Sequence, residues 1–465
     1  MTRGPGKSAR WLVASASAVV LLTVGFVVVR YQTYHQGLSF TQALCQLAGF
    51  SNGQGRSLAL RSKVPSNASA DMLKPMAVGF PVEGHPLIAS VTLVDLDQDG
   101  LQDILVCDML ANRIGWIRQG PPGVYNEQWV GPVLKAPARV QAFDIDLDGD
   151  LDLLVAVMGQ LMPTNDKIGS IVILENDGKQ NFTPHTVADR IARVTDVRGG
   201  DINGDGRMDL VVGQFGYHEG ETRWMENLGG WKFRPHILQS LSGPIHTIPI
   251  DIDHDGDLDI VSLVSQEWEE IYLFENSGSG EFKTHLIWGS TNDDYGCSGM
   301  RLVDLDQDGD MDILFTNGDA FDYIPPRPRP WHGVQWLENR GHLQFAYHRI
   351  GGLNGASAAC AADLDGDGDL DVIAVSAWNL WEKPESQSMV WFENDGKMNF
   401  VPHDLVNSPT HLITLETSDM NGDGRTDFVT GGMHFYPPYT RQSRVTLWLN
   451  TWTRPLSTSV HNPGH

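Results

Sequence analysis

The stretch SVTLVDLDQDGLQDILV, at Ser90–Val106, contains two short apolar runs on either side of a loop rich in aspartate. The runs are rich in Val, Ile and Leu and are too short for helices, so they predict two β-strands. The loop between them follows the pattern D-x-[DN]-x-D-G-x-x-D. The stretch therefore predicts a strand–loop–strand hairpin whose loop gathers several carboxylates.

This aspartate loop recurs seven times, at spacings of 49 to 59 residues. The copies begin at Asp95, Asp144, Asp201, Asp251, Asp304, Asp363 and Asp419. A second motif, E-N-x-G-x-x-x-F-x-x-H, occurs five times in register with the loop, at Glu175–His185, Glu226–His236, Glu275–His285, Glu338–His348 and Glu393–His403. Its x-Gly pair predicts a tight turn between two further strands. Each repeat thus has four strands, A to D, and the sequence predicts an all-β, seven-bladed β-propeller of four-stranded blades.

The two ends of the repeat region predict how the ring closes. The segment KPMAVGF (Lys74–Phe80) precedes the first repeat at the distance where D strands fall in the other repeats. The last repeat has a C strand, VTLWLN (Val445–Asn450), but no F-x-x-H segment after it. We therefore expect the N-terminal segment to supply the D strand of the last blade. An open solenoid would instead need capping repeats, which the sequence does not contain.

The composition of the aspartate loop favours calcium, which prefers six to eight oxygen ligands. Loop positions 1, 3, 5 and 9 supply side-chain oxygens, position 7 supplies its carbonyl, and glycine at position 6 allows the turn. One Asp-Gly turn is common without a metal, but seven in register are poorly explained by turn formation alone. No His or Cys joins the motif, so a catalytic metal is not indicated.

We therefore predict up to seven structural Ca²⁺ ions, one for each blade. The predicted ligands are Asp95, Asp97, Asp99, Leu101 and Asp103; Asp144, Asp146, Asp148, Asp150 and Asp152; Asp201, Asn203, Asp205, Arg207 and Asp209; Asp251, Asp253, Asp255, Asp257 and Asp259; Asp304, Asp306, Asp308, Asp310 and Asp312; Asp363, Asp365, Asp367, Asp369 and Asp371; and Asp419, Asn421, Asp423, Arg425 and Asp427.

The charge and the cysteines restrict the class of protein. The formal net charge of the 465-residue chain is -25, which argues against binding to nucleic acid. Seven Ca²⁺ ions would change this charge to -11, so much of the acidity is explained by metal ligation. The four cysteines, Cys45, Cys107, Cys297 and Cys360, show no paired spacing and predict no disulfide framework.

The loop, the repeat length and the number of repeats resemble the FG-GAP/VCBS repeat family, β-propellers found in integrin α heads and in many secreted bacterial proteins. The resemblance covers about residues 74–455. The FG and GAP signature letters are mostly absent, and all seven repeats carry the loop, whereas only some do in integrin α heads. This favours a VCBS-type protein. The resemblance implies a calcium-stabilised extracellular scaffold for adhesion or ligand binding, and a few family members are polysaccharide-active enzymes.

The N-terminus predicts a membrane anchor. Residues 11–29 contain no charged side chain and are long enough to cross a bilayer, and the basic residues within 1–10 predict a cytoplasmic N-terminus. A flexible linker (30–73), the propeller (74–455) and a tail (456–465) follow. A cleaved signal peptide is the alternative, in which case the protein would be secreted. In both cases we expect an extracytoplasmic propeller, in the periplasm or at the cell surface.

Strand alternation places the aspartate loops and the C–D turns on one face and the B–C loops on the other. The B–C loops are dissimilar and rich in aromatic residues, whose rings can stack on a ligand or pack between blades. The candidate ligand-binding residues are Tyr217, His218, Trp268, Tyr323, Trp331, His332, Trp378, Trp381, His434, Phe435 and Tyr436. The histidines that recur in the D strands are assigned to the scaffold.

Three functions are compatible with this sequence. We expect a binding or adhesion module for a carbohydrate or protein ligand. The first alternative is a polysaccharide lyase or hydrolase that uses Tyr217, His218, His332, His434 and Tyr436 as acids and bases. No nucleophile-elbow, haem or zinc motif supports an enzyme. The second alternative is a docking platform in a surface assembly. The oligomeric state does not follow from the sequence.

Overall fold

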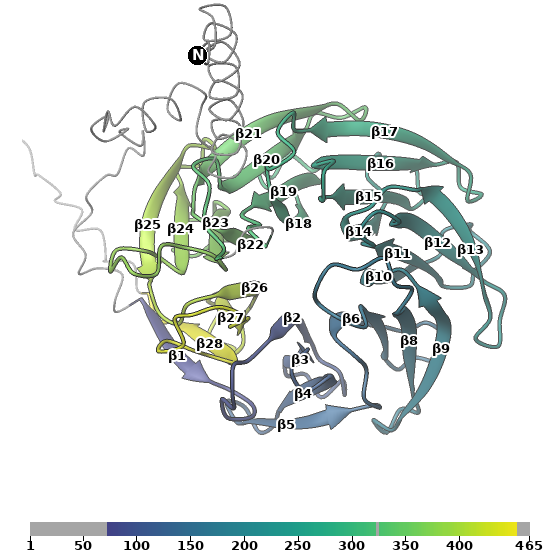
Figure 1. Cartoon of the computed structure of the whole chain (residues 1–465), viewed down its shortest axis with the longest axis horizontal. Helices are drawn as coiled ribbons and strands as arrows, with labels where there is room; N and C mark the ends of the chain where they lie inside the picture. Colours follow the sequence, from purple (N-terminus) through teal and green to yellow (C-terminus); the bar gives the residue numbers. More distant parts are fainter. Residues whose placement is uncertain (1–71, 322–324, 453–465) are drawn as a thin grey trace, which may run out of the picture. The chain divides into compact units, whose positions relative to one another are not determined.

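A computed structural model describes residues 72–321 and 325–452, all of which belong to one compact unit. These residues form 28 strands in seven four-stranded sheets and contain no helix. Figure 1 shows the sheets arranged as blades around a common centre. The predicted all-β, seven-bladed propeller is confirmed. The predicted anchor at residues 11–29 and the tail at 456–465 lie outside the described residues. Within the described ranges, no helix is long and apolar enough to cross a membrane.

Blades 1 to 6 each use four consecutive strands. Blade 1 comprises β2 (Ile88–Val94), β3 (Asp103–Asp108), β4 (Arg113–Gln119) and β5 (Tyr125–Val130). Blade 2 comprises β6 (Pro137–Phe143), β7 (Asp152–Val157), β8 (Gly169–Asn176) and β9 (Phe182–Ile191). Blade 3 comprises β10 (Val194–Gly200), β11 (Asp209–Gln214), β12 (Glu221–Asn227) and β13 (Phe233–Gln239).

The next blades repeat this order. Blade 4 comprises β14 (Pro244–Ile250), β15 (Asp259–Val264), β16 (Glu270–Asn276) and β17 (Phe282–Gly289). Blade 5 comprises β18 (Cys297–Val303), β19 (Asp312–Asn317), β20 (Gly333–Asn339) and β21 (Phe345–Gly352). Blade 6 comprises β22 (Ala356–Ala362), β23 (Asp371–Ser376), β24 (Met389–Asn394) and β25 (Phe400–Val406). Blade 7 comprises β26 (Leu412–Ser418), β27 (Asp427–Gly432), β28 (Val445–Asn450) and β1 (Leu73–Ala77).

The core is divided among the interfaces between blades. The B strand of every blade is buried along its whole length, because both faces of each sheet pack on neighbouring blades. Seven hydrophobic clusters of the described residues fill these interfaces, one between each pair of neighbouring blades. Strands buried on both faces read as continuous apolar runs, which explains why the B strands lack polar alternation.

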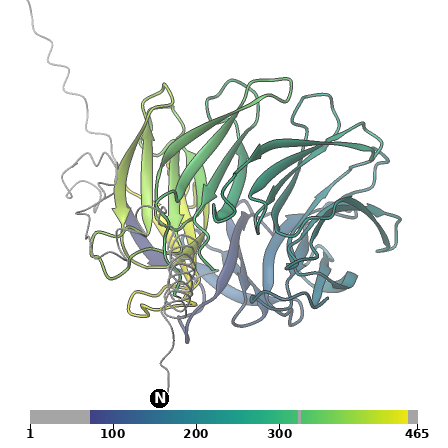
Figure 2. The ribbon, with the colours of Figure 1, turned by 45° about the horizontal axis from the view of Figure 1, so that its top comes forward.

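The ring closes as the sequence predicted. Strand β1 pairs antiparallel with β28, from Leu73 opposite Asn450 to Ala77 opposite Thr446. Figures 1 and 2 show this purple strand beside the yellow strands from the other end of the chain. The seven innermost strands contact one another in an unbroken circle.

A buried ion pair reinforces the closing interface between blades 7 and 1. The Arg444 guanidinium donates to both carboxylate oxygens of Glu127, at 2.6 and 2.7 Å, and to Asp108 Oδ2 at 3.1 Å. The backbone N–H of Phe80, just after β1, donates to Glu127 Oε2 at 2.6 Å. Two-pronged pairing of this kind offsets the desolvation of buried charges. These ion pairs and hydrogen bonds thus connect β1, blade 7 and blade 1.

Candidate metal loops and the opposite loop face

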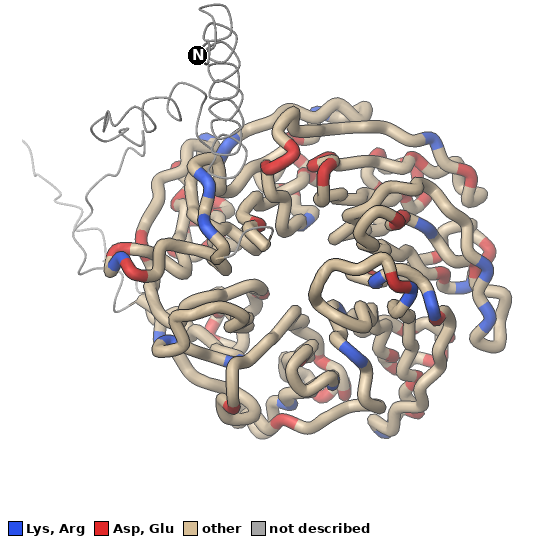
Figure 3. Tube along the Cα trace, in the orientation of Figure 1, with Lys and Arg blue, Asp and Glu red and all other residues tan. Residues whose placement is uncertain are grey.

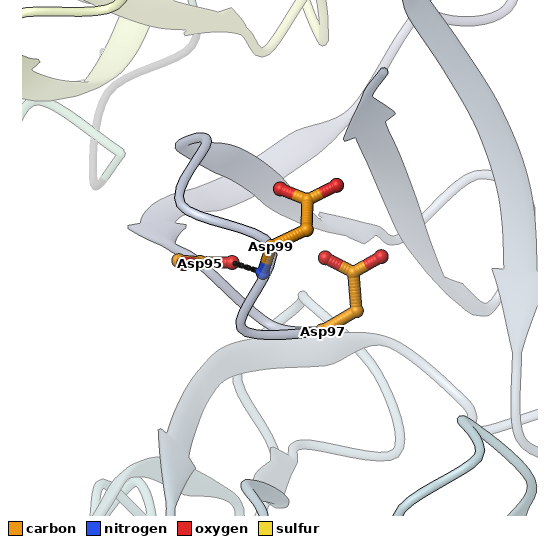
Figure 4. A group of neighbouring side chains, drawn as sticks. All are labelled: Asp95, Asp97 and Asp99. Carbon is orange, nitrogen blue, oxygen red and sulfur yellow. Dashed lines mark hydrogen bonds between the residues drawn. The ribbon is translucent and has the colours of Figure 1, made fainter. Parts of the chain in front are cut away.

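Each aspartate loop is folded by its own carboxylates. In blade 1, Asp95 accepts hydrogen bonds from the N–H groups of Asp99 at 2.9 Å and Gly100 at 2.8 Å. Figure 4 shows the first of these bonds beside the carboxylates of Asp97 and Asp99. Gly100 has a φ of +90°, and a Cβ built there would meet nothing within 4 Å. Backbone conformation rather than space therefore requires glycine at position 6.

Carboxylate oxygens converge in five of the loops. One oxygen from each of three aspartates lies within 4.8 Å of the others in Asp95/Asp97/Asp99, Asp144/Asp146/Asp152, Asp251/Asp253/Asp255, Asp304/Asp306/Asp308 and Asp363/Asp365/Asp371. Burial, followed by repulsion from neighbouring aspartates, raises the pKa of Asp146, Asp253 and Asp306. A hard divalent cation would remove that repulsion. The clusters therefore have the composition and geometry to bind a metal.

The aspartate at position 9 has a second role in every blade. Asp312, at the start of β19, accepts from Leu305 N at 3.0 Å and from Asn339 N at 2.7 Å. The same two bonds recur at Asp103, Asp152, Asp209, Asp259, Asp371 and Asp427. Burial raises the pKa of Asp312 to about 7. Position 9 thus ties the loop to the end of strand C, independently of any metal.

Three loops have an arginine beside their carboxylates. Arg207 and Arg425, at position 7 of blades 3 and 7, contact the position-5 aspartates Asp205 and Asp423. These two loops are also the ones with asparagine at position 3. In blade 1 the basic residue comes from strand C, where the Arg118 guanidinium lies 2.5 Å from Asp97 and 3.1 Å from Asp99. The seven loops therefore differ in charge although they share one motif.

The histidines that recur in the D strands pair with the glutamates of the E-N motif. His Nε2 lies 2.5–2.9 Å from Glu Oε2 in all five blades that carry the motif. The rings of His236, His348 and His403 also lie against the tryptophans Trp224, Trp336 and Trp391. These contacts link strands C and D of one blade, in agreement with the predicted scaffold role.

The structure divides the candidate ligand-binding residues into four groups. Trp268, which is 42% exposed, and His218 lie on the surface. Tyr217, Trp331, Phe435 and Tyr436 are partly exposed. The buried candidates are His332, Trp378, Trp381 and His434. Tyr323 lies outside the described residues. The B–C face thus uses part of its aromatic content as its own core.

The two buried histidines among these candidates, His332 and His434, form hydrogen bonds with the backbone. His332 Nδ1 accepts from the N–H groups of Arg329 and Gly355, at 3.3 and 3.2 Å. His434 Nε2 lies 3.0 Å from both the N and the O of Ser443. Burial lowers the pKa of His332 to about 3 and that of His434 to about 4, so both rings are neutral at physiological pH.

An aromatic patch covers the B–C loops of blades 5 to 7. Buried Trp378 packs with Phe321 and Tyr436, at ring-centroid distances of 4.8 and 5.9 Å. Tyr439, which is 41% exposed, stacks at 3.7 Å on His85 from the segment before β2. Sequence reasoning missed Tyr439 and His85. Tyr439 lies in the same aromatic run as Tyr436 and was recognisable by that, whereas His85 joins the patch only through ring closure.

Comparisons with known proteins agree with this architecture. A family model described as the FG-GAP-like repeat matches residues 95–155, 144–212, 201–262 and 251–315, which confirms the predicted resemblance. No curated protein matches the chain.

Among solved structures, BBS1N in complex with ARL6DN matches at 12% identity, with a TM-score of 0.48, over 82% of this chain and 97% of that chain. The Dos1 propeller matches at 8% identity, with a TM-score of 0.44, over 78% of this chain and 77% of that chain. The Vibrio cholerae (V. cholerae) biofilm matrix protein Bap1 matches at 12% identity, with a TM-score of 0.40, over 82% and 91%. The chain is a seven-bladed β-propeller in which the repeats over residues 95–315 match the FG-GAP-like repeat.

Proposed function

We propose that this propeller is a calcium-stabilised, extracytoplasmic binding module whose B–C loop face takes a carbohydrate or protein ligand. The observation that carries the proposal is the contrast between its two faces. One face repeats a single carboxylate loop seven times, whereas the other presents loops that differ in sequence and gather exposed aromatic rings. Binding residues concentrate on variable loops held by a rigid scaffold.

Calcium is the cation best matched to the aspartate loops. The side chains that the motif offers are oxygen donors, and in five of the loops three carboxylates already converge without histidine or cysteine. The ions would stabilise the A–B hairpins rather than perform chemistry, because each loop is closed by carboxylates from its own blade. The apolar segment at residues 11–29 supports export of the propeller and its attachment to a membrane.

The aromatic patch is the part of the B–C face best suited to a ligand. Tyr436 and Tyr439 present rings at the surface, and Tyr436 lies against buried Trp378, which restrains it. Tyrosine combines a stacking face with a hydroxyl group at low entropic cost, which suits both sugar rings and protein side chains. Because His332 and His434 are buried and neutral, this face supports binding better than acid–base catalysis.

The test is binding of the full-length protein to a broad glycan panel, with calcium and with EGTA. We expect calcium-dependent binding to one sugar class, weakened about tenfold or more by Tyr436→Ala or Tyr439→Ala, since aromatic anchors dominate such interfaces. Tyr347→Ala, at an exposed tyrosine on the outer strand β21, is the matched control. Binding unchanged by both patch variants would contradict the site. No binding by the folded protein would favour a protein ligand, to be sought by pull-down.

A further inference from the structure

The innermost strands bring charged side chains from several blades toward the ring axis. Figure 1 shows β6, β10, β14, β18 and β26 lining the centre of the ring. The charged residues on the seven inner strands are Arg139 (β6), Asp196 and Arg198 (β10), Arg301 (β18) and Glu416 (β26), and β14 adds His246. They occupy the third or fifth position of their strands, on the same side of a bulge that recurs in all seven blades. Three arginines thus share the axis with two carboxylates.

Asp196 is the common partner in the first of two groups of ion pairs at the axis. Its carboxylate accepts from Arg198 Nε at 3.2 Å and from Thr247 N at 3.0 Å, and it lies 3.3 Å from Arg139 Nε. The Asp196 side chain is fully buried. Blades 2, 3 and 4 supply these contacts. The negative charge of Asp196 is compensated by the guanidinium groups of Arg139 and Arg198.

Arg301 belongs to the second group. Its guanidinium lies 2.5 Å from Glu416 and donates to Leu415 O at 2.8 Å, so it reaches from blade 5 to blade 7. Blade 6 has only Ala358 and Cys360 at the corresponding positions, which leaves room for the long side chain to pass. The ion pair is therefore made near the axis, past an intervening blade.

The balance of charge at the axis is positive. His246 is buried, and its pKa lies well below the ordinary value because of that burial and then because of Arg139, Arg198 and Arg301. His246 is thus neutral at physiological pH, which leaves three positive charges against two negative ones. Its Nδ1 is 4.0 Å from Asp196 and finds no hydrogen-bond partner among residues 72–321 and 325–452. The positive balance at the axis contrasts with the whole chain, which has 58 acidic residues against 33 Lys and Arg, and Figure 3 shows acidic positions in all parts of the ring.

The three arginine side chains are not fully buried. The side chains of Arg198, Arg139 and Arg301 are 22%, 24% and 37% exposed, although they lie on the innermost strands. At the B–C end of these strands an apolar cluster of Met109, Met158, Met433 and neighbours, including Phe321, joins blades 1, 2, 5 and 7.

We propose that Arg139, Arg198 and Arg301 form an anion site at the ring axis that binds an oxyanion group, the carboxylate or sulfate of an acidic ligand. The planar guanidinium group donates paired hydrogen bonds that match such oxyanions. Glu416 competes with the ligand for Arg301, so displacing that carboxylate accompanies binding. The site lies on different residues from the aromatic patch and does not depend on it.

The test is calorimetric titration of the full-length protein with inorganic sulfate and, separately, with glucuronate, at constant ionic strength in chloride. We expect saturable binding of at least one anion. Arg198→Gln and Arg301→Gln should each weaken it about tenfold, the value of one charge-assisted hydrogen bond. Glu416→Gln should tighten binding, because it frees Arg301 and raises the local positive charge. Damage to the fold would not produce that increase.

The matched control is Arg234→Gln, at an exposed arginine on the outer strand β13 that also pairs with a glutamate. Sulfate and glucuronate distinguish the two kinds of oxyanion, and an acidic oligosaccharide that competes with them would identify the group as part of a glycan. If neither anion binds the folded protein, or if Arg301→Gln and Glu416→Gln leave affinity unchanged, the proposal is wrong. The Glu416→Gln variant keeps the test decisive should an arginine variant fail to fold.

Discussion

The two faces of this propeller differ in how much variation they allow. Every A–B loop contains eight residues between its strands, whereas the B–C loops range from four residues in blade 1 to fifteen in blade 5. In every A–B loop the position-9 aspartate bonds to the end of strand C, and in five of the loops three carboxylates also converge, which restricts the loop length. The B–C loops meet no such common requirement. In the proposed function, the constant loops stabilise the ring and the variable loops bind the ligand, so changes to the two faces should have different effects.

Calcium removal should give the largest effect, because it acts on the repeated face alone. A ligand present at about one hundred times its dissociation constant adds about 2.7 kcal/mol per site, and several loops act together. We therefore expect EGTA to lower the melting temperature by more than about 10 °C, since each kcal/mol shifts it by a few degrees in a large domain. Differential scanning calorimetry with calcium, magnesium and EGTA measures this. A melt indifferent to EGTA would remove the calcium assignment but leave the fold intact.

Two aspartates of one loop should separate metal binding from scaffold bonding. In blade 5, Asp312 at position 9 is buried and accepts two backbone hydrogen bonds, whereas Asp308 at position 5 is exposed. In EGTA we expect Asp312→Ala to cost about 3 kcal/mol, because it leaves buried N–H groups unpaired, and Asp308→Ala less than about 1 kcal/mol.

With calcium, both variants should lose in addition the stabilisation by one ion, measured as the shift between chemical melts with and without the metal. Equal costs in EGTA would show that position 9 is only a ligand. If Asp308→Ala alone lost calcium stabilisation, position 9 would be scaffold only. The comparison of Asp312→Ala with Asp308→Ala thus separates the loss of a calcium ligand from the loss of the backbone hydrogen bonds.

Sequence reasoning succeeded where a feature repeats. The blade count, the A–B hairpins and the closing strand follow from spacing, and the pairing of Leu73 with Asn450 confirms the last of these. Sequence reasoning did not reveal the second role of Asp312. This carboxylate accepts hydrogen bonds from the N–H groups of Leu305 and Asn339, and only the folded blade brings these groups together. The motif alone indicates a ligand and nothing more.

The B–C face was predictable in composition but not in exposure. Trp378 and Tyr436 are alike as aromatic loop residues, yet Trp378 is buried beneath its neighbours and Tyr436 remains partly exposed. The difference arises from contacts among the B–C loops of blades 5, 6 and 7, which are separated by whole blades along the chain. The charged residues at the axis could not be grouped from the sequence either, because Arg301 and Glu416 are 115 positions apart and meet only in the closed ring.

The smallest expected effect concerns Glu269, a buried carboxylate on the B–C face that does not belong to a cluster of aspartates. Glu269 accepts from Cys297 N at 2.7 Å, and burial raises its pKa to about 7, against an ordinary value near 4.5. A carboxyl group whose pKa is raised in the folded state adds stability that is full below the ordinary value and is lost as pH rises through about 7. Between pH 5.5 and 8 the wild type should therefore lose up to about 2 kcal/mol through this group.

Glu269→Gln should abolish that loss, because the amide keeps a carbonyl oxygen for Cys297 N and has no proton to release. Urea melts at pH 5.5 and 8, with calcium throughout, measure the difference, and Glu267→Gln at an exposed position of the same loop is the control. If the Glu269→Gln variant falls in stability with pH as steeply as the wild type, the buried carboxyl is not the cause. If the stability of the Glu269→Gln variant changes less with pH than that of the wild type, the B–C face contains a titrating carboxyl group that favours low pH. Calcium binding by the aspartate loops would have the opposite pH dependence, because it requires ionised aspartates.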